Sequence, residues 1–74
     1  MKGIVYSGKI VEFDKNTKKV TLEYFSNRER VSRSFKIDPE KEKYFINLVG
    51  EIVDIFVVDD LIKYINLQDD EEIF

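Results

Sequence analysis

The sequence predicts a single small domain that is mostly β: a closed barrel of five strands with one short helix between the third and fourth strands. Three observations lead to this prediction. Five runs of β-prone residues are separated by short turn signals, a glycine interrupts the first run, and the only proline follows an aspartate where a helix would begin. A chain of 74 residues has room for one domain, so we expect the barrel over residues 1–67 and an acidic tail over residues 68–74.

The first two predicted strands form a hairpin. Two β-prone runs, residues 9–13 and 20–25, flank the polar segment from Asp14 to Lys18. Asp and Asn favour turns because their side chains hydrogen-bond to their own backbone and tolerate left-handed conformations. The segment therefore predicts an antiparallel hairpin closed by a five-residue loop.

The first strand is expected to be long and bent. Its β-prone residues begin at Ile4, and Gly8 interrupts them before the run continues to Phe13. A lone glycine inside a strand usually marks a bulge or a sharp bend, because the missing Cβ lets the strand coil. A bent first strand that serves two sheets is what a small closed barrel needs.

The second and third strands alternate between apolar and polar residues. In the second strand this pattern places Phe25 on the polar face, while the third strand, residues 31–37, follows a turn over residues 26–29. Arg33 shares a face with the apolar residues Phe35 and Ile37. An arginine fits such a position if it lies at a barrel mouth or if the strand bulges nearby.

The segment from Asp38 to Glu40 is a helix start signal. Aspartate can cap free N–H groups, and Pro39 has a φ angle that suits the first turn. The apolar residues expected to form the buried stripe of this helix are Tyr44, Phe45 and Leu48, and Gly50 is suited to its C-terminal end.

Two further strands are predicted after the helix. Residues 51–58 are nearly all apolar, and we expect a strand that is buried on both faces. Asp59 and Asp60 form a turn before the last strand, residues 61–67.

The composition argues against catalytic and metal chemistry. The chain has no cysteine and no histidine, and its only methionine is the first residue, so we expect no disulfide, no metal site and no cofactor. Nucleophilic catalysis would need a base beside a Ser or Thr, and no histidine can supply it. The longest apolar run has four residues, 55–58. We therefore expect a non-enzymatic protein without a signal peptide or membrane partner, in the cytoplasm.

The net charge of −3 is unevenly distributed. Residues 1–43 carry eleven Lys and Arg against seven Asp and Glu, whereas residues 44–74 carry one against eight. A basic front half suggests a polyanionic partner, and an acidic back half suggests self-masking or a protein partner.

The order of three strands, a helix and two strands, with a bent first strand, resembles the OB-fold, a five-stranded Greek-key barrel. An SH3-like barrel is the alternative. The hairpin G-x-I-x-x-F-D…V-T-L is similar to that of periplasmic copper-binding OB proteins. Their metal-ligating His, Met and Trp have no counterparts in this sequence, so the resemblance supports the fold and argues against the metal.

Residues 20–67 also resemble the WYL domain, through V-T-L-E-Y, S-R-S-F-K-I-D-P, K-Y-F-I and F-V-V-D-D-L-I-K-Y-I. The tryptophan of that family is missing. This resemblance would make residues 43–48 a strand, and it implies a ligand-sensing module.

The OB resemblance implies that nucleic acid would bind across the second and third strands, flanked by the first and last loops. The cations expected to hold phosphates there are Lys18, Lys19, Arg28, Arg30, Arg33 and Lys36. Phe25 is the candidate for stacking on a base, with Tyr24 and Tyr64 as further candidates. Base stacking contributes about 1–3 kcal/mol per base and tolerates any sequence. The alternative is an ordinary solvated basic face, because the chain as a whole is acidic.

The tail, D-D-E-E-I-F, resembles the acidic C-terminal tip of bacterial and phage single-stranded-DNA-binding proteins. In that family the tip docks on replication and repair proteins and competes with DNA for the protein's own groove. The residues that would form this partner-binding tip are Asp69, Asp70, Glu71, Glu72, Ile73 and Phe74. The long linker and the penultimate proline of the family are missing. The alternatives are a solubilising terminus, or a terminus whose last two residues fold back as core or dimer contacts.

The leading hypothesis is therefore a non-enzymatic module that binds single-stranded DNA or RNA, with an acidic tip that recruits a protein partner or masks the groove. The alternative is a protein–protein interaction module or small regulator that uses an exposed strand edge or the acidic half of the chain. A homo-oligomer is a further alternative, since a core of this size is marginal on its own.

Overall fold

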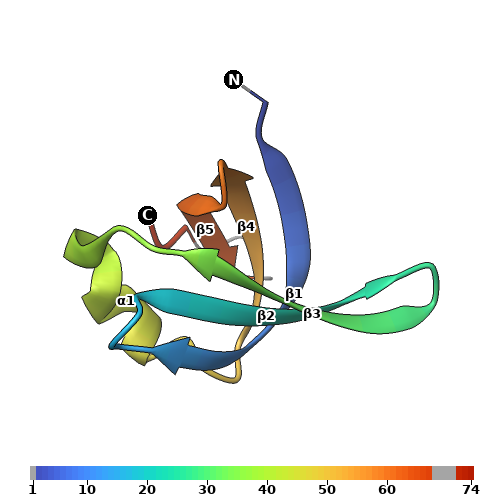
Figure 1. Cartoon of the computed structure of the whole chain (residues 1–74), viewed down its shortest axis with the longest axis horizontal. Helices are drawn as coiled ribbons and strands as arrows, with labels where there is room; N and C mark the ends of the chain where they lie inside the picture. The colour runs from blue at the N-terminus through green and yellow to red at the C-terminus, as the bar shows by residue number, and fades with distance from the viewer. Residues whose placement is uncertain (1, 68–71) are drawn as a thin grey trace.

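A computed structural model describes residues 2–67 and 72–74. It contains strands β1 (Ile4–Asp14), β2 (Lys19–Ser26), β3 (Glu29–Lys36), β4 (Ile52–Val58) and β5 (Leu61–Leu67), and the helical segments η1 (Pro39–Lys41) and α1 (Glu42–Ile46). The strands close into a barrel in the order β1-β2-β3-β5-β4 (Figure 1). The predicted fold class, a mostly β five-stranded barrel with one short helix between the third and fourth strands, is confirmed.

The barrel is closed by one short parallel contact between β3 and β5. This contact consists of one residue pair, Lys36 with Leu61. The other four pairings between described strands are antiparallel and extend over more residues. The backbone N–H of Lys36 also donates to the carbonyl oxygen of Asp60 at 2.7 Å. The C-terminal residues Ile73 and Phe74 lie beside β5, where their backbone is hydrogen-bonded to Ile65 (Figure 1).

Strand β1 serves two parts of the barrel, as its predicted bend required. Residues 4–9 pair with β4, and residues 9–14 pair with β2. The register shifts between Ile10 and Glu12, so the bulge lies two to three residues after Gly8. Gly8 has a different role, because a Cβ there would lie 2.3 Å from the carbonyl oxygen of Glu23. The glycine therefore allows the β2 backbone to approach β1 closely.

The turn chemistry of the first hairpin follows the sequence. A side-chain oxygen of Asp14 accepts hydrogen bonds from the backbone N–H groups of Asn16 at 2.8 Å and Thr17 at 3.3 Å. These bonds favour the ionised carboxylate and hold the pKa of Asp14 below its ordinary value of 3.8. The same Asx geometry fixes the start of the loop.

The two other hairpins have two-residue turns. Asn27 and Arg28 join β2 to β3, and Asp59 and Asp60 join β4 to β5. All four residues have a positive φ, between 52° and 67°. Two consecutive positive φ values are typical of the type I′ turn, whose twist matches that of the flanking strands.

The helical segment begins where the sequence predicts, but α1 ends at Ile46, before the predicted end at Gly50. The side chain of Asp38 accepts a hydrogen bond from the backbone N–H of Glu40 at 3.0 Å, and Pro39 follows directly. Phe45 and Leu48 are buried against the barrel, although Leu48 lies beyond the end of α1. Gly50 has a φ of 94°, which other residues rarely adopt. The strand that the WYL resemblance implies at residues 43–48 is not seen, since residues 42–46 are helical.

The core fills the barrel and its α1 end. Its buried apolar members among the described residues are Ile10, Val20, Leu22, Phe35, Ile37, Phe45, Leu48, Val53, Ile55, Val57, Ile62 and Ile65. No helical segment in residues 2–67 and 72–74 has the length and apolar character needed to cross a membrane.

The expectation that residues 51–58 are buried on both faces is wrong. Val53, Ile55 and Val57 point into the core, but Ile52 and Asp54 are exposed. The physical reason is that β4 lies in the wall of a single-layer barrel, between β1 and β5, so only one of its faces meets the core. The apolar residues on its other face therefore form a surface.

Candidate nucleic-acid interface

The outer face of the β2–β3 ribbon carries most of the predicted site. The alternation of each strand buries Val20, Leu22 and Phe35 and turns the intervening residues outward. The outward residues face each other in four cross-strand pairs: Lys19 with Lys36, Thr21 with Ser34, Glu23 with Ser32, and Phe25 with Arg30. The structure therefore brings four of the seven predicted nucleic-acid-binding residues onto one face.

Two lysines face each other at the barrel end of this ribbon. Lys19 and Lys36 are directly opposite cross-strand partners, and both are exposed. Within the described part of the chain, neither belongs to an ion pair. Like charges directly opposite each other are destabilising. An anion placed between the two ammonium groups would relieve that repulsion.

The middle of the ribbon is polar. The hydroxyl oxygens of Thr21 and Ser34 are hydrogen-bonded to each other at 3.0 Å. Beyond them, Glu23 lies opposite Ser32 and forms a 3.4 Å ion pair with Nε of Arg30. Glu23 is the only acidic side chain among the eight outward residues, and it opposes the binding of a polyanion.

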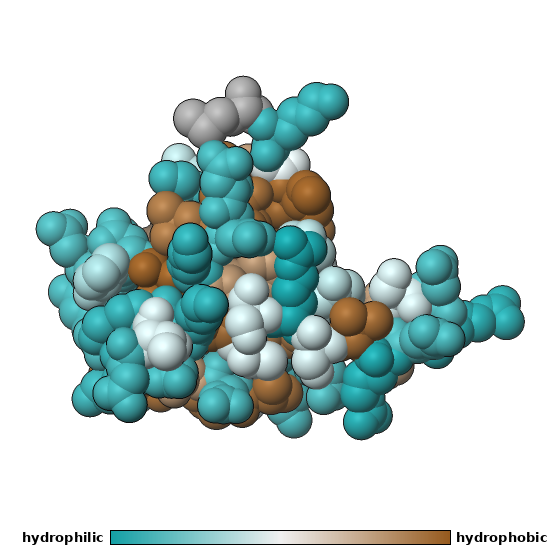
Figure 2. Space-filling view, in the orientation of Figure 1, coloured by the Kyte–Doolittle hydropathy of each residue, from teal (hydrophilic) through white to brown (hydrophobic). Residues whose placement is uncertain are grey.

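The far end of the ribbon carries an exposed aromatic ring. β2 and β3 project from the barrel as an arm (Figure 1), and Figure 2 shows an apolar patch at the base of this arm. Phe25 is 71% exposed and lies opposite Arg30. Arg28 is exposed in the turn at the tip. A flat apolar ring next to a guanidinium is the combination that binds a base together with its phosphate.

Lys18 and Arg33 do not belong to this face. Nζ of Lys18 forms a 2.9 Å ion pair with Glu42, which ties the first loop to α1. Arg33 points to the inner side of β3 and donates hydrogen bonds to the hydroxyl of Tyr6 at 2.7 Å and to Asp60 at 2.9 Å. Both cations therefore have a partner within the barrel.

Arg33 lies at the mouth of the barrel. Its guanidinium carbon is 5.5 Å from the ring centre of Tyr6 and 5.2 Å from that of Phe35. The interaction with Tyr6, followed by the hydrogen bond to Asp60, raises the pKa of Arg33 above its ordinary value. The pairing of β2 with β3 continues without a register shift past this residue, so no bulge is needed to accommodate it.

The last loop is acidic where it approaches the ribbon. Asp60 is bonded through its carbonyl oxygen to the backbone of Lys36 and through its side chain to Arg33. The preceding residue, Asp59, is exposed. The carboxylates of this loop would repel the phosphate backbone of a nucleic acid. A nucleic-acid strand on the ribbon would therefore leave it at Lys36 and would not cross the loop. Among the described residues, no group of three or more acidic side chains could hold a metal ion.

The structure describes only the last three residues of the predicted tip. Asp69, Asp70 and Glu71 lie outside the described residues, and Glu72 is exposed beside Asn66. The last two residues fold back on β5: the N–H of Ile73 donates to the carbonyl of Ile65 at 2.9 Å, and the N–H of Ile65 donates to the carbonyl of Phe74 at 3.1 Å.

The ring of Phe74 packs beside the helix. Its centroid lies 5.3 Å from that of Tyr44 and 5.7 Å from that of Phe45, and Nζ of Lys41 lies 5.1 Å from it. Ile73 and Phe74 are both partly buried against the core. In this structure the terminal phenylalanine is therefore a packing residue of the barrel, which is the fold-back alternative of the sequence analysis.

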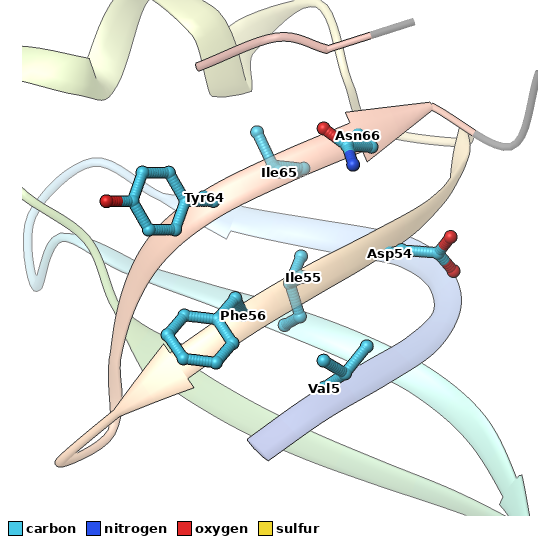
Figure 3. A pocket seen from close by; sticks show the side chains of 7 residues that line it. All are labelled: Val5, Asp54, Ile55, Phe56, Tyr64, Ile65 and Asn66. Atoms are coloured by element: carbon cyan, nitrogen blue, oxygen red, sulfur yellow. The ribbon is translucent and has the colours of Figure 1, made fainter. Parts of the chain in front are cut away.

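A second exposed surface covers β1, β4 and β5. Val5, Phe56 and Tyr64 are cross-strand neighbours, and Figure 3 shows them side by side at one end of a small hollow of about 90 Å³. Val5 is 63% exposed and Tyr64 is 59% exposed. We call these three residues the apolar row. The sequence does not indicate this row, because residues 51–58 were expected to be buried on both faces.

Comparisons with models of protein families, with curated proteins and with solved structures find no match to this chain.

Proposed function

We propose that this protein binds single-stranded nucleic acid across the outer face of the β2–β3 ribbon. One observation carries the proposal: a strongly exposed ring, Phe25, lies opposite Arg30 on the same face as two opposed lysines, Lys19 and Lys36. Aromatic platforms and cations that follow one ribbon are the two components of sequence-tolerant single-strand binding.

The two ends of the ribbon have different roles in this proposal. A phosphate binds between Lys19 and Lys36, where it relieves the repulsion of the two ammonium groups. A base stacks on Phe25, and Arg30 holds the adjoining phosphate. The six residue steps from Lys19 to Phe25 correspond to about 20 Å of strand. That length suits a short site of about four nucleotides, at the lower end of the range for small barrels of this kind.

The polar centre of the ribbon limits affinity. The hydroxyls of Thr21 and Ser34 can turn to a phosphate or sugar oxygen, at the cost of their mutual hydrogen bond. The carboxylate of Glu23 repels the nucleic-acid backbone and occupies Arg30. Weak, salt-sensitive binding is therefore expected, and Glu23→Gln should strengthen it.

The acidic tail enters this proposal through its charge. Because Phe74 packs on Tyr44 and Phe45, we assign partner docking or competition with nucleic acid to the carboxylates of residues 69–72. Competition of this kind needs no specific contact, only proximity to the basic ribbon at low salt.

The test is fluorescence anisotropy of labelled single-stranded oligonucleotides at several salt concentrations. Three phosphate contacts, one shared by Lys19 and Lys36 and one each from Arg30 and Arg28, predict that log K falls with log salt with a slope of about −2. The double variant Lys19→Ala/Lys36→Ala should lower the magnitude of the slope by about 1. Lys63→Ala, which removes an exposed lysine of β5, is the matched control and should bind like the wild type.

Two results would overturn the proposal. One is the absence of binding by the wild-type chain at low salt. The other is equal affinity and equal salt slope for the wild type and the double lysine variant, because binding would then use another surface.

A protein-interaction module is the second candidate function, and the apolar row is the observation that favours it. Val5 and Tyr64 are largely exposed around the ring of Phe56, and aromatic residues are enriched at protein interfaces. Association through this surface would rest on apolar contact and would change little with salt. Tyr64→Ser should weaken it while leaving oligonucleotide binding unchanged.

A further inference from the structure

A groove lies at the fork where β1 and β2 separate. The two strands pair from Lys9 and Glu23 onwards, in the direction of the first loop. On the other side of this pair, β1 continues beside β4, whereas β2 continues with β3 into the projecting arm (Figure 1). The space between the diverging strands forms a groove of about 330 Å³. This volume is at the lower end of the range for small-molecule sites.

The groove has apolar side chains from two different strands. Phe25 comes from the arm, and Ile52 comes from the start of β4 and is 48% exposed. Two cations, Lys9 and Arg30, also line it. The one acidic side chain, Glu23, is already paired with Arg30. The groove therefore combines a flat apolar surface with a net positive charge.

The edges of the groove present backbone groups that have no partner among the described strands. The N–H and C=O groups of Ile10 bond to Glu51 and Gly50, on the β4 side of β1. Because successive residues of a strand direct these groups to opposite sides, those of Lys9 and Ser7 point towards β2. Lys9 meets Glu23 there, but the described pairing of β1 with β2 does not extend to Ser7.

The same alternation applies to β2. Glu23 directs its backbone groups towards β1, so Phe25, two residues further along, directs its own groups to the same side. The described strands offer these groups no partner either. Hydrogen-bond donors and acceptors therefore face the groove from both of its sides, beside the apolar wall.

We infer that the fork groove is a pocket for one nucleobase of the bound strand. The base stacks on Phe25 against Ile52, its polar edge meets the free backbone groups of Ser7 and Phe25, and Lys9 or Arg30 holds its phosphate. This inference rests on the proposed function and adds a site that includes β1 and β4. The cationic rim and the flat ring favour a base with a phosphate over an added peptide strand, which would need no charge.

The experiment uses short oligonucleotides in which 2-aminopurine occupies each position in turn. The chain contains no tryptophan, so its own emission interferes little with the probe. Stacking in a pocket should quench the fluorescence several-fold at one position and weakly at the others. Ile52→Ala should reduce this quenching and weaken binding threefold or more. Val49→Ala, another half-exposed apolar residue that lies outside the groove, should change neither quantity.

An abasic nucleotide at the quenched position gives an independent result. Wild-type protein should bind this oligonucleotide at least as weakly as Ile52→Ala binds the complete one, and Ile52→Ala should weaken binding of the abasic oligonucleotide no further. Far-UV circular dichroism of each variant verifies that the barrel is folded.

The outcomes separate this inference from the proposed function. If the double lysine variant loses affinity but no position is quenched and Ile52→Ala binds normally, the pocket is refuted while ribbon binding stands. If no oligonucleotide binds, both are refuted. If the amides of Ser7 and Phe25 become protected from exchange as the protein concentration rises, without oligonucleotide, a strand from a second copy occupies the groove and the inference is wrong.

Discussion

The terminal phenylalanine provides the most direct test of how the chain completes its barrel. Replacing Phe74 with alanine removes a ring that packs on Tyr44 and Phe45 and that lies under the ammonium group of Lys41. The backbone of Phe74 is bonded to Ile65 through main-chain atoms. The substitution therefore removes side-chain packing and leaves those hydrogen bonds available.

The expected loss of stability follows from the burial of the ring. A fully buried Phe→Ala substitution costs about 3–5 kcal/mol. Phe74 is only partly buried, so we expect about half of that value, or about 2 kcal/mol. A chain of 74 residues has a total unfolding free energy of about 4–11 kcal/mol. The loss of one terminal side chain should therefore remove a fifth to a half of the stability.

The assay is urea unfolding followed by far-UV circular dichroism. With a slope of about 1–2 kcal/mol per molar urea for a chain of this size, the midpoint should fall by about 1–2 M. Phe25→Ala is the matched control, because it is the same substitution at a ring that is 71% exposed. It should shift the free energy of unfolding by less than about 0.5 kcal/mol. Equal stability of the two variants would refute the structural role of Phe74.

Three further predictions concern the barrel itself. Gly8→Ala places a Cβ 2.3 Å from the carbonyl oxygen of Glu23 and should cost about 1–3 kcal/mol in urea unfolding, unlike a glycine at an open position. Arg33→Met should lower the urea midpoint because Asp60 loses its hydrogen-bond donor, and Arg33→Lys should not restore it, since one ammonium group cannot replace a guanidinium that bonds two partners. Asp14→Asn should be less stable than the wild type at neutral pH. Because folding lowers the pKa of Asp14, this difference in stability should shrink as the pH falls below about 4. Unfolding curves of both proteins measured at several pH values would test this.

The parts of the fold that the sequence predicted depend on local chemistry. Asp14 and Asn16 define the first loop through their own side-chain and backbone groups, and Asp38 caps the helical segment within two residues. The period-two pattern of β2 likewise predicts that Phe25 lies on the outer face of the barrel, where its ring is exposed. Each of these signals involves residues that are close in sequence, so the sequence alone carries them.

The errors and omissions concern interactions between distant segments. The apolar residues of β4 are compatible with burial on two faces or on one, and only its position between β1 and β5 decides. The fork groove combines Phe25 with Ile52, which are 27 positions apart, and no local pattern brings them together. The ion pairs of Lys18 with Glu42 and of Arg33 with Asp60 also join distant elements, so no local pattern in the sequence indicates these partners.

The packing of the last two residues changes how the acidic tail can be studied. A truncation after Leu67 would remove the charges of the tail together with Ile73 and Phe74, which pack on the core. Any change in oligonucleotide binding would then mix the loss of competing charge with the loss of stability. Neutralising residues 69–72 to amides while retaining Ile73 and Phe74 separates the two. Stronger binding at low salt by this variant, with an unchanged urea midpoint, would assign competition to the carboxylates, because charge is then the only property that differs.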